Sequence, residues 1–268
     1  MKIWAVYFSA TGTTKKIVTA IARGLGEGLG AAECEFDFTL PAARGGWPEF
    51  MPDDIVVFGV PVYAGRVPNV LLKYLDTVAG NGAFAVPIVL YGNRDFDDAL
   101  IELRDILAGH GFLPHAAAAF VGEHAFSYEL AKGRPDGKDL HCASKFAERL
   151  CAKWWDRSSG IVETPGTPYP YRGYYMPRDR KGNPIDIRKV KPFTKESCDE
   201  CGVCAEVCPM GSISRENMRE CSGICIKCGA CVKACPKHAK YFDDKGYLYH
   251  LHQLEEGLKN RREPELFL

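Results

Sequence analysis

Strand-like and helix-like patterns of hydrophobic and polar residues alternate over the first 155 residues. Five short runs have the composition or alternation of strands: Ile3–Phe8, Glu33–Phe38, Asp54–Val60, Phe84–Leu90 and Ala116–Val121. Between them, apolar residues recur at helical spacing over Lys15–Leu29, Val70–Val78, Phe96–Leu107 and Asp139–Trp155. This order predicts the α/β class, with a doubly wound, parallel five-stranded sheet and right-handed crossovers.

The pattern breaks down between Ser158 and Pro192, where six prolines and four tyrosines interrupt any regular period. Between Arg172 and Lys195 there are eight basic residues and only two acidic ones. We interpret this stretch as a basic connector. Complementary charge would let it dock an acidic protein partner, or it is a solvated arm that spans two domains.

Composition narrows the class of protein. The chain has 268 residues, 46% hydrophobic and 25% charged, which is typical of globular domains. Lys and Arg total 34 and so do Asp and Glu, and this balance argues against a nucleic-acid or membrane-surface protein. No run approaches the roughly 20 apolar residues of a membrane span. The first residues contain no small-residue cleavage site, so we expect a cytoplasmic protein.

Cysteine usage changes the picture, because nine of the 12 cysteines lie between Cys198 and Cys235. Eight of these nine form two copies of the run C-x2-C-x2-C-x3-C-P, which is typical of bacterial two-cluster ferredoxins. The first copy contains Cys198, Cys201, Cys204 and Cys208, and the second contains Cys225, Cys228, Cys231 and Cys235. In such runs the first three cysteines bind one [4Fe-4S] cluster and the fourth binds the other. Cys235 would therefore complete the first set, and Cys208 the second.

The alternative is a pair of structural zinc sites, which usually show two separated C-x2-C pairs for each ion. Two three-plus-one sets fit iron–sulfur clusters better. Cys221 lies just outside the second copy and has no assigned role. We expect it to be a packed thiol and not a ligand.

A second signature follows the first predicted strand. The turn there opens a helix and consists of Ser9, Ala10, Thr11, Gly12, Thr13 and Thr14. Its hydroxyls and backbone N–H groups would form an anion site at the positive end of the helix dipole. The phosphate-binding pattern of nucleotide hydrolases and the dinucleotide fingerprint are both absent. This turn therefore favours a bound monophosphate.

Two later loops would meet this turn at the carboxyl edge of a parallel sheet, where ligands of such sheets bind. The first follows the third strand and contains Pro61, Val62, Tyr63, Ala64 and Gly65. The second follows the fourth strand and contains Tyr91, Gly92, Asn93, Arg94, Asp95 and Phe96. Their aromatic side chains would flank a flat ring system, and their backbone groups would contact its polar edge.

On these three loops, residues 1–155 resemble a flavodoxin, and on the two cysteine copies residues 192–242 resemble a two-cluster ferredoxin. The order of the parts resembles the flavodoxin–ferredoxin fusion proteins of anaerobes. That resemblance extends to PYRGYYMPRDRKGNP in the connector and to KYFDDKGYLYH after the second copy. It implies the sheet order 2-1-3-4-5, with FMN held by the three loops. The second loop contains no tryptophan to stack on the flavin, so the covering ring is not identified.

The resemblance implies three parts: a flavodoxin-like FMN-binding domain over 1–157, the connector over 158–191, and a small α+β ferredoxin domain with two [4Fe-4S] clusters over 192–268, including a C-terminal extension. The leading interpretation is an electron-transfer protein that relays electrons between FMN and the clusters in anaerobic low-potential metabolism. Its expected partners are redox proteins: a ferredoxin, a flavodoxin or an oxidoreductase. It needs no catalytic acid, base or nucleophile, and none is evident.

The alternative is a flavin-dependent oxidoreductase that reduces a small substrate with electrons from its own clusters. A redox sensor would require a signalling or DNA-binding element, and the sequence shows none.

Overall fold

The computed structural model describes residues 1–154 and 160–268. Five parallel strands form the main sheet in the order β2-β1-β3-β4-β6, which confirms the predicted order 2-1-3-4-5. They are β1 (Lys2–Tyr7), β2 (Ala32–Asp37), β3 (Ile55–Pro61), β4 (Phe84–Tyr91) and β6 (Ala117–Val121). A short strand, β5 (Leu113–Pro114), also pairs with β4, and a 3₁₀ turn, η1 (Pro41–Gly45), follows β2.

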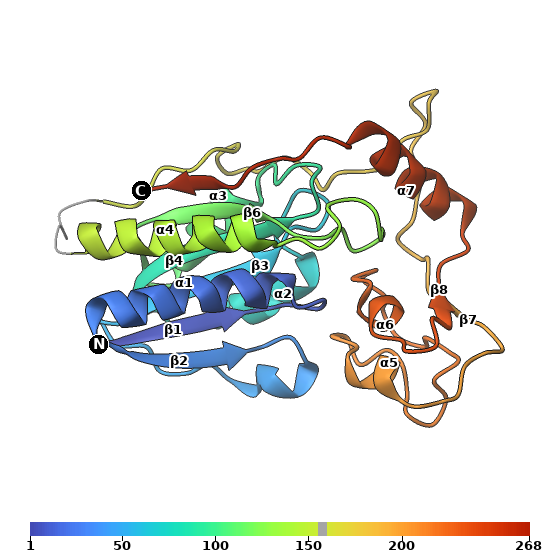
Figure 1. Ribbon diagram of the computed structural model, residues 1–268, viewed down its shortest axis with the longest axis horizontal. Helices are drawn as coiled ribbons and strands as arrows, with labels where there is room; N and C mark the ends of the chain where they lie inside the picture. The colour runs from blue at the N-terminus through green and yellow to red at the C-terminus, as the bar shows by residue number, and fades with distance from the viewer. Residues whose placement is uncertain (155–159) are drawn as a thin grey trace.

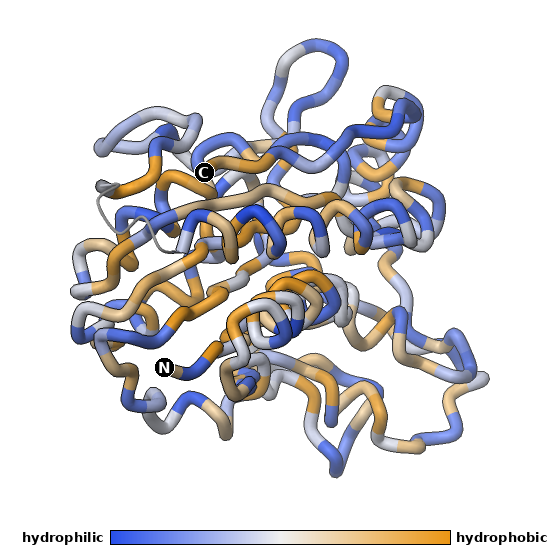
Figure 2. Tube along the Cα trace, turned by 60° about the vertical axis from the view of Figure 1, so that its left-hand side comes forward, coloured by the Kyte–Doolittle hydropathy of each residue, from blue (hydrophilic) through white to orange (hydrophobic). Residues whose placement is uncertain are grey.

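Helices cover both faces of this sheet (Figure 1). Helices α1 (Thr13–Leu29) and α4 (Gly137–Lys153) pack on one face, and α2 (Asn69–Leu75) and α3 (Ala99–Gly109) on the other. Side chains alternate along each strand, so every central strand contributes to both cores. Strands β4 and β6 are buried throughout, which explains their uninterrupted apolar sequences and the hydrophobic segments that run through the molecule in Figure 2.

The closing helix begins slightly earlier than predicted, after Asp136, whose side chain caps it. Its predicted end at Trp155 lies outside the described residues, as does the expected domain boundary between residues 157 and 158. No helix in the described ranges is both long enough and apolar enough to cross a membrane.

The cysteine-rich part lies beyond the carboxyl ends of the parallel strands (Figure 1). Strands β7 (Phe193–Thr194) and β8 (Lys240–Tyr241) form a two-stranded antiparallel sheet beside two single-turn helices, α5 (Val203–Glu206) and α6 (Ala230–Lys233). Each helix follows a glycine with positive φ, Gly202 at 84° and Gly229 at 75°. The repeated motif therefore gives a repeated local structure.

The C-terminal residues return to the main sheet. Helix α7 (Lys245–Gly257) is followed by strand β9 (Glu265–Phe267), which pairs antiparallel with β6 and forms a new edge of the sheet (Figure 1). Neither element was predicted from the sequence. Together they tie the cysteine-rich part to the N-terminal part on the side opposite β2.

Candidate cofactor site

A cavity of about 620 Å³ lies at the carboxyl edge of the main sheet. This is the position at which open parallel sheets bind ligands, and the volume is in the usual range for ligand sites, about 300–1,000 Å³. The three predicted loops all contribute to its wall. The lining residues that the sequence predicted are Ala10, Thr11, Thr13, Thr14, Pro61, Val62, Tyr63, Ala64, Gly65, Tyr91, Gly92, Arg94 and Asp95.

The first loop is arranged as an anion site. Helix α1 begins after Gly12, whose φ is 83°, and its first turn contains no acidic residue. In the described part of the chain, the backbone N–H groups of Thr11, Thr13 and Thr14 donate to no protein acceptor. Unpaired N–H groups at a helix N-terminus suit a phosphate.

Ser9 and Gly12 shape this loop without lining the cavity. The Ser9 hydroxyl accepts a hydrogen bond of 2.9 Å from the Lys15 N–H, and the Gly12 carbonyl accepts one of 3.1 Å from the Lys16 N–H. Both contacts hold the start of α1 in place.

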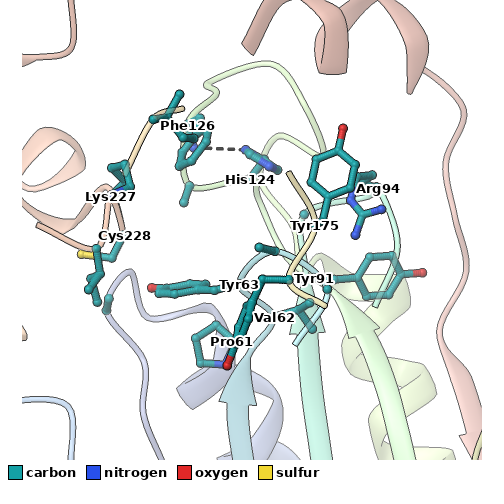
Figure 3. A pocket seen from close by; sticks show the side chains of 18 of the residues that line it. Pro61, Val62, Tyr63, Tyr91, Arg94, His124, Phe126, Tyr175, Lys227 and Cys228 are labelled. Atoms are coloured by element: carbon teal, nitrogen blue, oxygen red, sulfur yellow. Dashed lines mark hydrogen bonds between the residues drawn. The ribbon is translucent and has the colours of Figure 1, made fainter. Parts of the chain in front are cut away.

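The second loop is a tight turn in which Tyr63 and Arg66 exchange two backbone hydrogen bonds of 3.0 and 3.1 Å. Both central residues have positive φ, Ala64 at 51° and Gly65 at 77°. A Cβ atom on Gly65 would lie only 2.3 Å from a carboxylate oxygen of Asp97, so this position also requires glycine sterically. The turn directs the Tyr63 ring across the cavity toward Cys228 (Figure 3).

Some residues of the third loop line the cavity, and the others pack around it. Arg94 lies in the wall with its guanidinium 4.4 Å from the centre of the Tyr175 ring (Figure 3). Asn93 and Phe96 are not among the lining residues. The buried Asn93 amide donates to the carbonyls of Leu258 and Asn260 at 2.8 and 2.9 Å. These hydrogen bonds anchor the segment that joins α7 to β9. Phe96 packs on the Tyr91 ring with 5.5 Å between centres.

The opposite wall comes from four distant segments: Gly122–Phe126, Tyr174–Pro177, Ile185–Arg188 and Ile224–Cys228, with His250 and Leu254 of α7. The connector reaches the cavity because the buried Asp98 carboxylate accepts hydrogen bonds from the Thr167 and Arg172 N–H groups, at 2.9 and 2.8 Å. The Tyr175 N–H then donates to the Ala64 carbonyl at 2.7 Å. No periodic pattern in the connector signals this contact.

Two histidines in this wall are neutral at physiological pH. Burial lowers the pKa of His124 to about 3, helped by the nearby charges of His250, Lys233 and Arg94. Burial and the Arg94 charge lower the pKa of His250 to about 4. The Nδ1 atom of His124 accepts a hydrogen bond of 3.1 Å from the Phe126 N–H, so its ring proton is on Nε2 (Figure 3).

The predicted cluster cysteines fall into two groups. Cys208 of the first motif copy lines a small cavity together with Cys225, Cys228 and Cys231 of the second, and we call these four the inner set. The pKa of Cys228 is raised to about 12, mainly by burial and further by Cys225 and Cys208. Cys225 and Cys228 also line the 620 Å³ cavity, so the inner set adjoins the three loops.

Cys198, Cys201, Cys204 and Cys235 form the outer set. Burial raises the pKa of Cys204, and the charges of Cys198 and Cys235 raise it further, which shows that the fourth cysteine of the second copy lies near the first copy. Cys201 is exposed. Both groupings have the composition that crossed ligation predicts. No three His, Cys, Asp or Glu side chains converge at single-ion spacing within residues 1–154 and 160–268.

Backbone donors support the two crossing cysteines equally. The Ser212 N–H donates to the Cys208 sulfur at 3.3 Å, and the Ala239 N–H donates to the Cys235 sulfur at 3.2 Å. At Cys235 the N–H groups of Ala239, Lys237 and Lys240 outweigh the effect of burial and lower the thiol pKa. Hydrogen bonds to ligand sulfur are a usual means of setting cluster potential. The donor set, the buried surroundings and the N–H contacts all fit iron–sulfur clusters.

The inner set is fixed against the N-terminal part by close packing. The Lys233 ammonium donates to a Glu123 carboxylate oxygen at 2.5 Å, to the His124 carbonyl at 2.9 Å and to the Ser127 carbonyl at 3.0 Å. A Cβ atom on Gly229, which follows Cys228, would lie 2.4 Å from the Ala125 carbonyl oxygen. The segment after β6 therefore packs directly on the loop that carries Cys228.

Comparison with known proteins agrees with the cysteine pattern. A 4Fe-4S binding domain model matches residues 192–214 and 222–241, which supports 4Fe-4S binding by this segment. No curated protein sequence matches the chain.

Solved structures similar to the N-terminal part include a flavodoxin from the domain Archaea, with 19% identity, a TM-score of 0.41, and coverage of 57% of this chain and 98% of that one. Oxidised Flavodoxin 2 from Bacillus cereus has 16% identity, a TM-score of 0.41, and coverage of 57% and 99%. Rubredoxin oxygen:oxidoreductase from Desulfovibrio gigas has 13% identity, a TM-score of 0.41, and coverage of 59% and 37%.

The chain thus combines a doubly wound, flavodoxin-like fold with a C-terminal ferredoxin-type 4Fe-4S domain, as the resemblance to flavodoxin–ferredoxin fusions predicts. Together with this fold, the 4Fe-4S motifs support a redox role in electron transfer.

Proposed function

We propose that the chain holds FMN in the 620 Å³ cavity and one [4Fe-4S] cluster in each cysteine set, and that it relays electrons between an external redox protein and the flavin. When bound, each cluster carries one electron, and FMN carries one or two. One observation supports this proposal above all: Cys225 and Cys228 of the inner set line the same cavity as the three predicted flavin loops.

Several residues suit the flavin. The Thr11, Thr13 and Thr14 amides would bind its phosphate, and the Tyr63 ring projects across the cavity toward Cys228 (Figure 3). Burial, with Cys228 and Cys225 beside it, raises the pKa of Tyr63, so its phenol stays protonated. Tyr63 would therefore separate the flavin ring from the inner set without adding a charge.

The outer set is the proposed contact point for the external protein. The exposed Cys201 belongs to it, whereas Cys228 is half-buried and forms part of the cavity wall. Connector residues and α7 cover the flavin cavity, so a protein partner reaches the flavin less directly than it reaches the outer set. Electrons would pass from the outer set to the inner set and then to the flavin, or in reverse.

Rapid mixing without oxygen tests this order. A reduced two-cluster ferredoxin, too large to enter the cavity, is mixed with the loaded protein, and flavin and cluster absorbance are followed. We expect flavin to be reduced in the wild type and at least 100-fold more slowly in Cys231→Ala, which lacks the inner cluster. An unchanged rate in a Cys231→Ala protein that retains flavin would disprove the relay.

Lys233→Met is expected to weaken the attachment of the inner set. It removes three hydrogen bonds from one ammonium and leaves the Glu123 carboxylate without that partner, so the free energy of unfolding should fall by about 2 kcal/mol. Flavin reduction in the rapid-mixing experiment should also slow, at unchanged iron and flavin content.

The matched control is Lys132→Met. Lys132 pairs with Glu129 on the surface at 3.3 Å, and both side chains are more than 60% exposed, so its loss should change stability little. Equal effects of the two substitutions would show that the Lys233 contacts do not fix the inner set.

A further inference from the structure

The two motif copies differ at one buried position. Five residues after the last cysteine of each copy, the first copy has Ile213 and the second has Lys240. These side chains are 5% and 2% exposed. In both copies the N–H of the preceding residue, Ser212 or Ala239, donates to the sulfur of that last cysteine. The same position is therefore filled by an apolar side chain in one copy and by an ammonium in the other.

The Lys240 ammonium has no carboxylate partner among the residues that the structure describes. It donates to the Thr194 hydroxyl at 2.7 Å and to the Met218 carbonyl, and both acceptors are neutral. A buried charge is costly unless an opposite charge lies close to it. The position therefore suits an anion that is not a carboxylate of the protein.

Lys240 is close to both cysteine sets. It belongs to β8, which packs against α6, the helix that carries Cys231 of the inner set. The residue before it donates to the sulfur of Cys235, which belongs to the outer set. Burial raises the pKa of Cys204 and of Cys231, and the charge of Lys240 opposes that rise at both thiols. One ammonium therefore acts on both sets.

Resting on the proposed function, we propose that Lys240 is a buried counter-ion shared by the two clusters, and that it raises the reduction potential of both. A [4Fe-4S] cluster with four thiolate ligands carries a net negative charge, which increases when the cluster accepts an electron. A nearby cation stabilises the reduced form more than the oxidised form. Because the ammonium is buried, salt screens this effect only weakly.

An EPR-monitored redox titration of the whole protein, prepared without oxygen, tests the counter-ion. Lys240→Met has a side chain of similar length without the charge. Each cluster in this variant should be about tenfold harder to reduce, which is a shift of about 59 mV to more negative potential for one electron. Lys240→Arg keeps the charge and should stay close to the wild type. The shift in Lys240→Met should be the same at low and high salt.

Lys237→Met is the matched control. Lys237 pairs with Asp199 at 3.9 Å on the surface of the same part of the chain, and the two side chains are 54% and 45% exposed. Water and salt screen its charge, so its loss should change the potentials little. Unchanged potentials in Lys240→Met, or a shift of one cluster only, would overturn the shared counter-ion.

Iron content separates this test from that of the proposed function. If Lys240→Met loses its clusters while Lys240→Arg retains them, the charge is needed to hold the clusters, which supports the counter-ion. If both variants lose them equally, the position requires the shape of lysine and not its charge, and the counter-ion is refuted. A wild type with one cluster or none would instead refute the proposed pair of clusters.

Discussion

Cys235→Ala is expected to halve the iron and labile sulfide of the protein, from about eight of each to about four per chain. The cluster lost should be the outer one, held by Cys198, Cys201 and Cys204, although Cys235 belongs to the second motif copy. The physical reason is the grouping of the thiols, since Cys204 responds to the charge of Cys235 while Cys208 shares a cavity with the second copy.

The remaining cluster identifies which site was emptied. In Cys235→Ala the inner cluster should still exchange electrons with the flavin, whereas in Cys208→Ala the outer cluster remains and flavin reduction slows. Cys151→Ala is the control, because Cys151 of α4 packs against Gly28 of α1. This substitution should leave the iron content unchanged. A Cys235→Ala protein that loses the cluster beside the flavin would contradict the crossed arrangement.

Thr11→Glu should release the flavin. A carboxylate in the anion loop would stand close to the proposed FMN phosphate, and two unit charges about 4 Å apart repel by about 4 kcal/mol at an effective dielectric constant near 20. That energy corresponds to roughly a 1000-fold higher Kd. Flavin absorbance relative to protein after gel filtration measures the loss, and heat-released flavin should be FMN and not FAD.

Thr11→Gln is the matched control for this change, since it has the same size without the charge and should retain most of the flavin. Thr19→Glu places the same charge later in α1, away from the cavity lining, and should bind flavin normally. Flavin at wild-type content in Thr11→Glu would show that the phosphate is not bound by this loop.

Local sequence patterns predicted secondary structure correctly in segments whose faces have uniform surroundings. The apolar run Asp54–Val60 is a strand because both of its faces are covered, and Lys15–Leu29 is helical because one stripe of it packs on the sheet. The cysteine copies form similar turns because Gly202 and Gly229 occupy equivalent positive-φ positions. Such features depend on residues that are close together in the sequence, so the spacing of residue types predicts them directly.

Contacts between distant segments were not predictable in this way. Asn93, which was predicted to be a flavin-loop residue, anchors the segment between α7 and β9 through the carbonyls of Leu258 and Asn260. Strand β9 is only three residues long, and it pairs with β6 at the edge of the sheet. That edge exists only after the parallel sheet has formed. The tyrosines of the connector gave no sign that the Tyr175 ring would contact the Arg94 guanidinium in the cavity wall.

The sequence by itself determined the α/β class and the spacing of the cluster cysteines, because both are encoded in short-range periodicity or in a local motif. The strand order was implied by the resemblance to flavodoxins. Tertiary structure alone decided that Cys225 and Cys228 border the cavity formed by the three loops, and that Cys221 lines the same small cavity as the inner set. Those placements depend on contacts between the cysteine-rich part and the N-terminal part. The contacts are the Lys233 hydrogen bonds and the close approach of Gly229 to Ala125. Packing between surfaces far apart in the chain has no period for a sequence pattern to reveal.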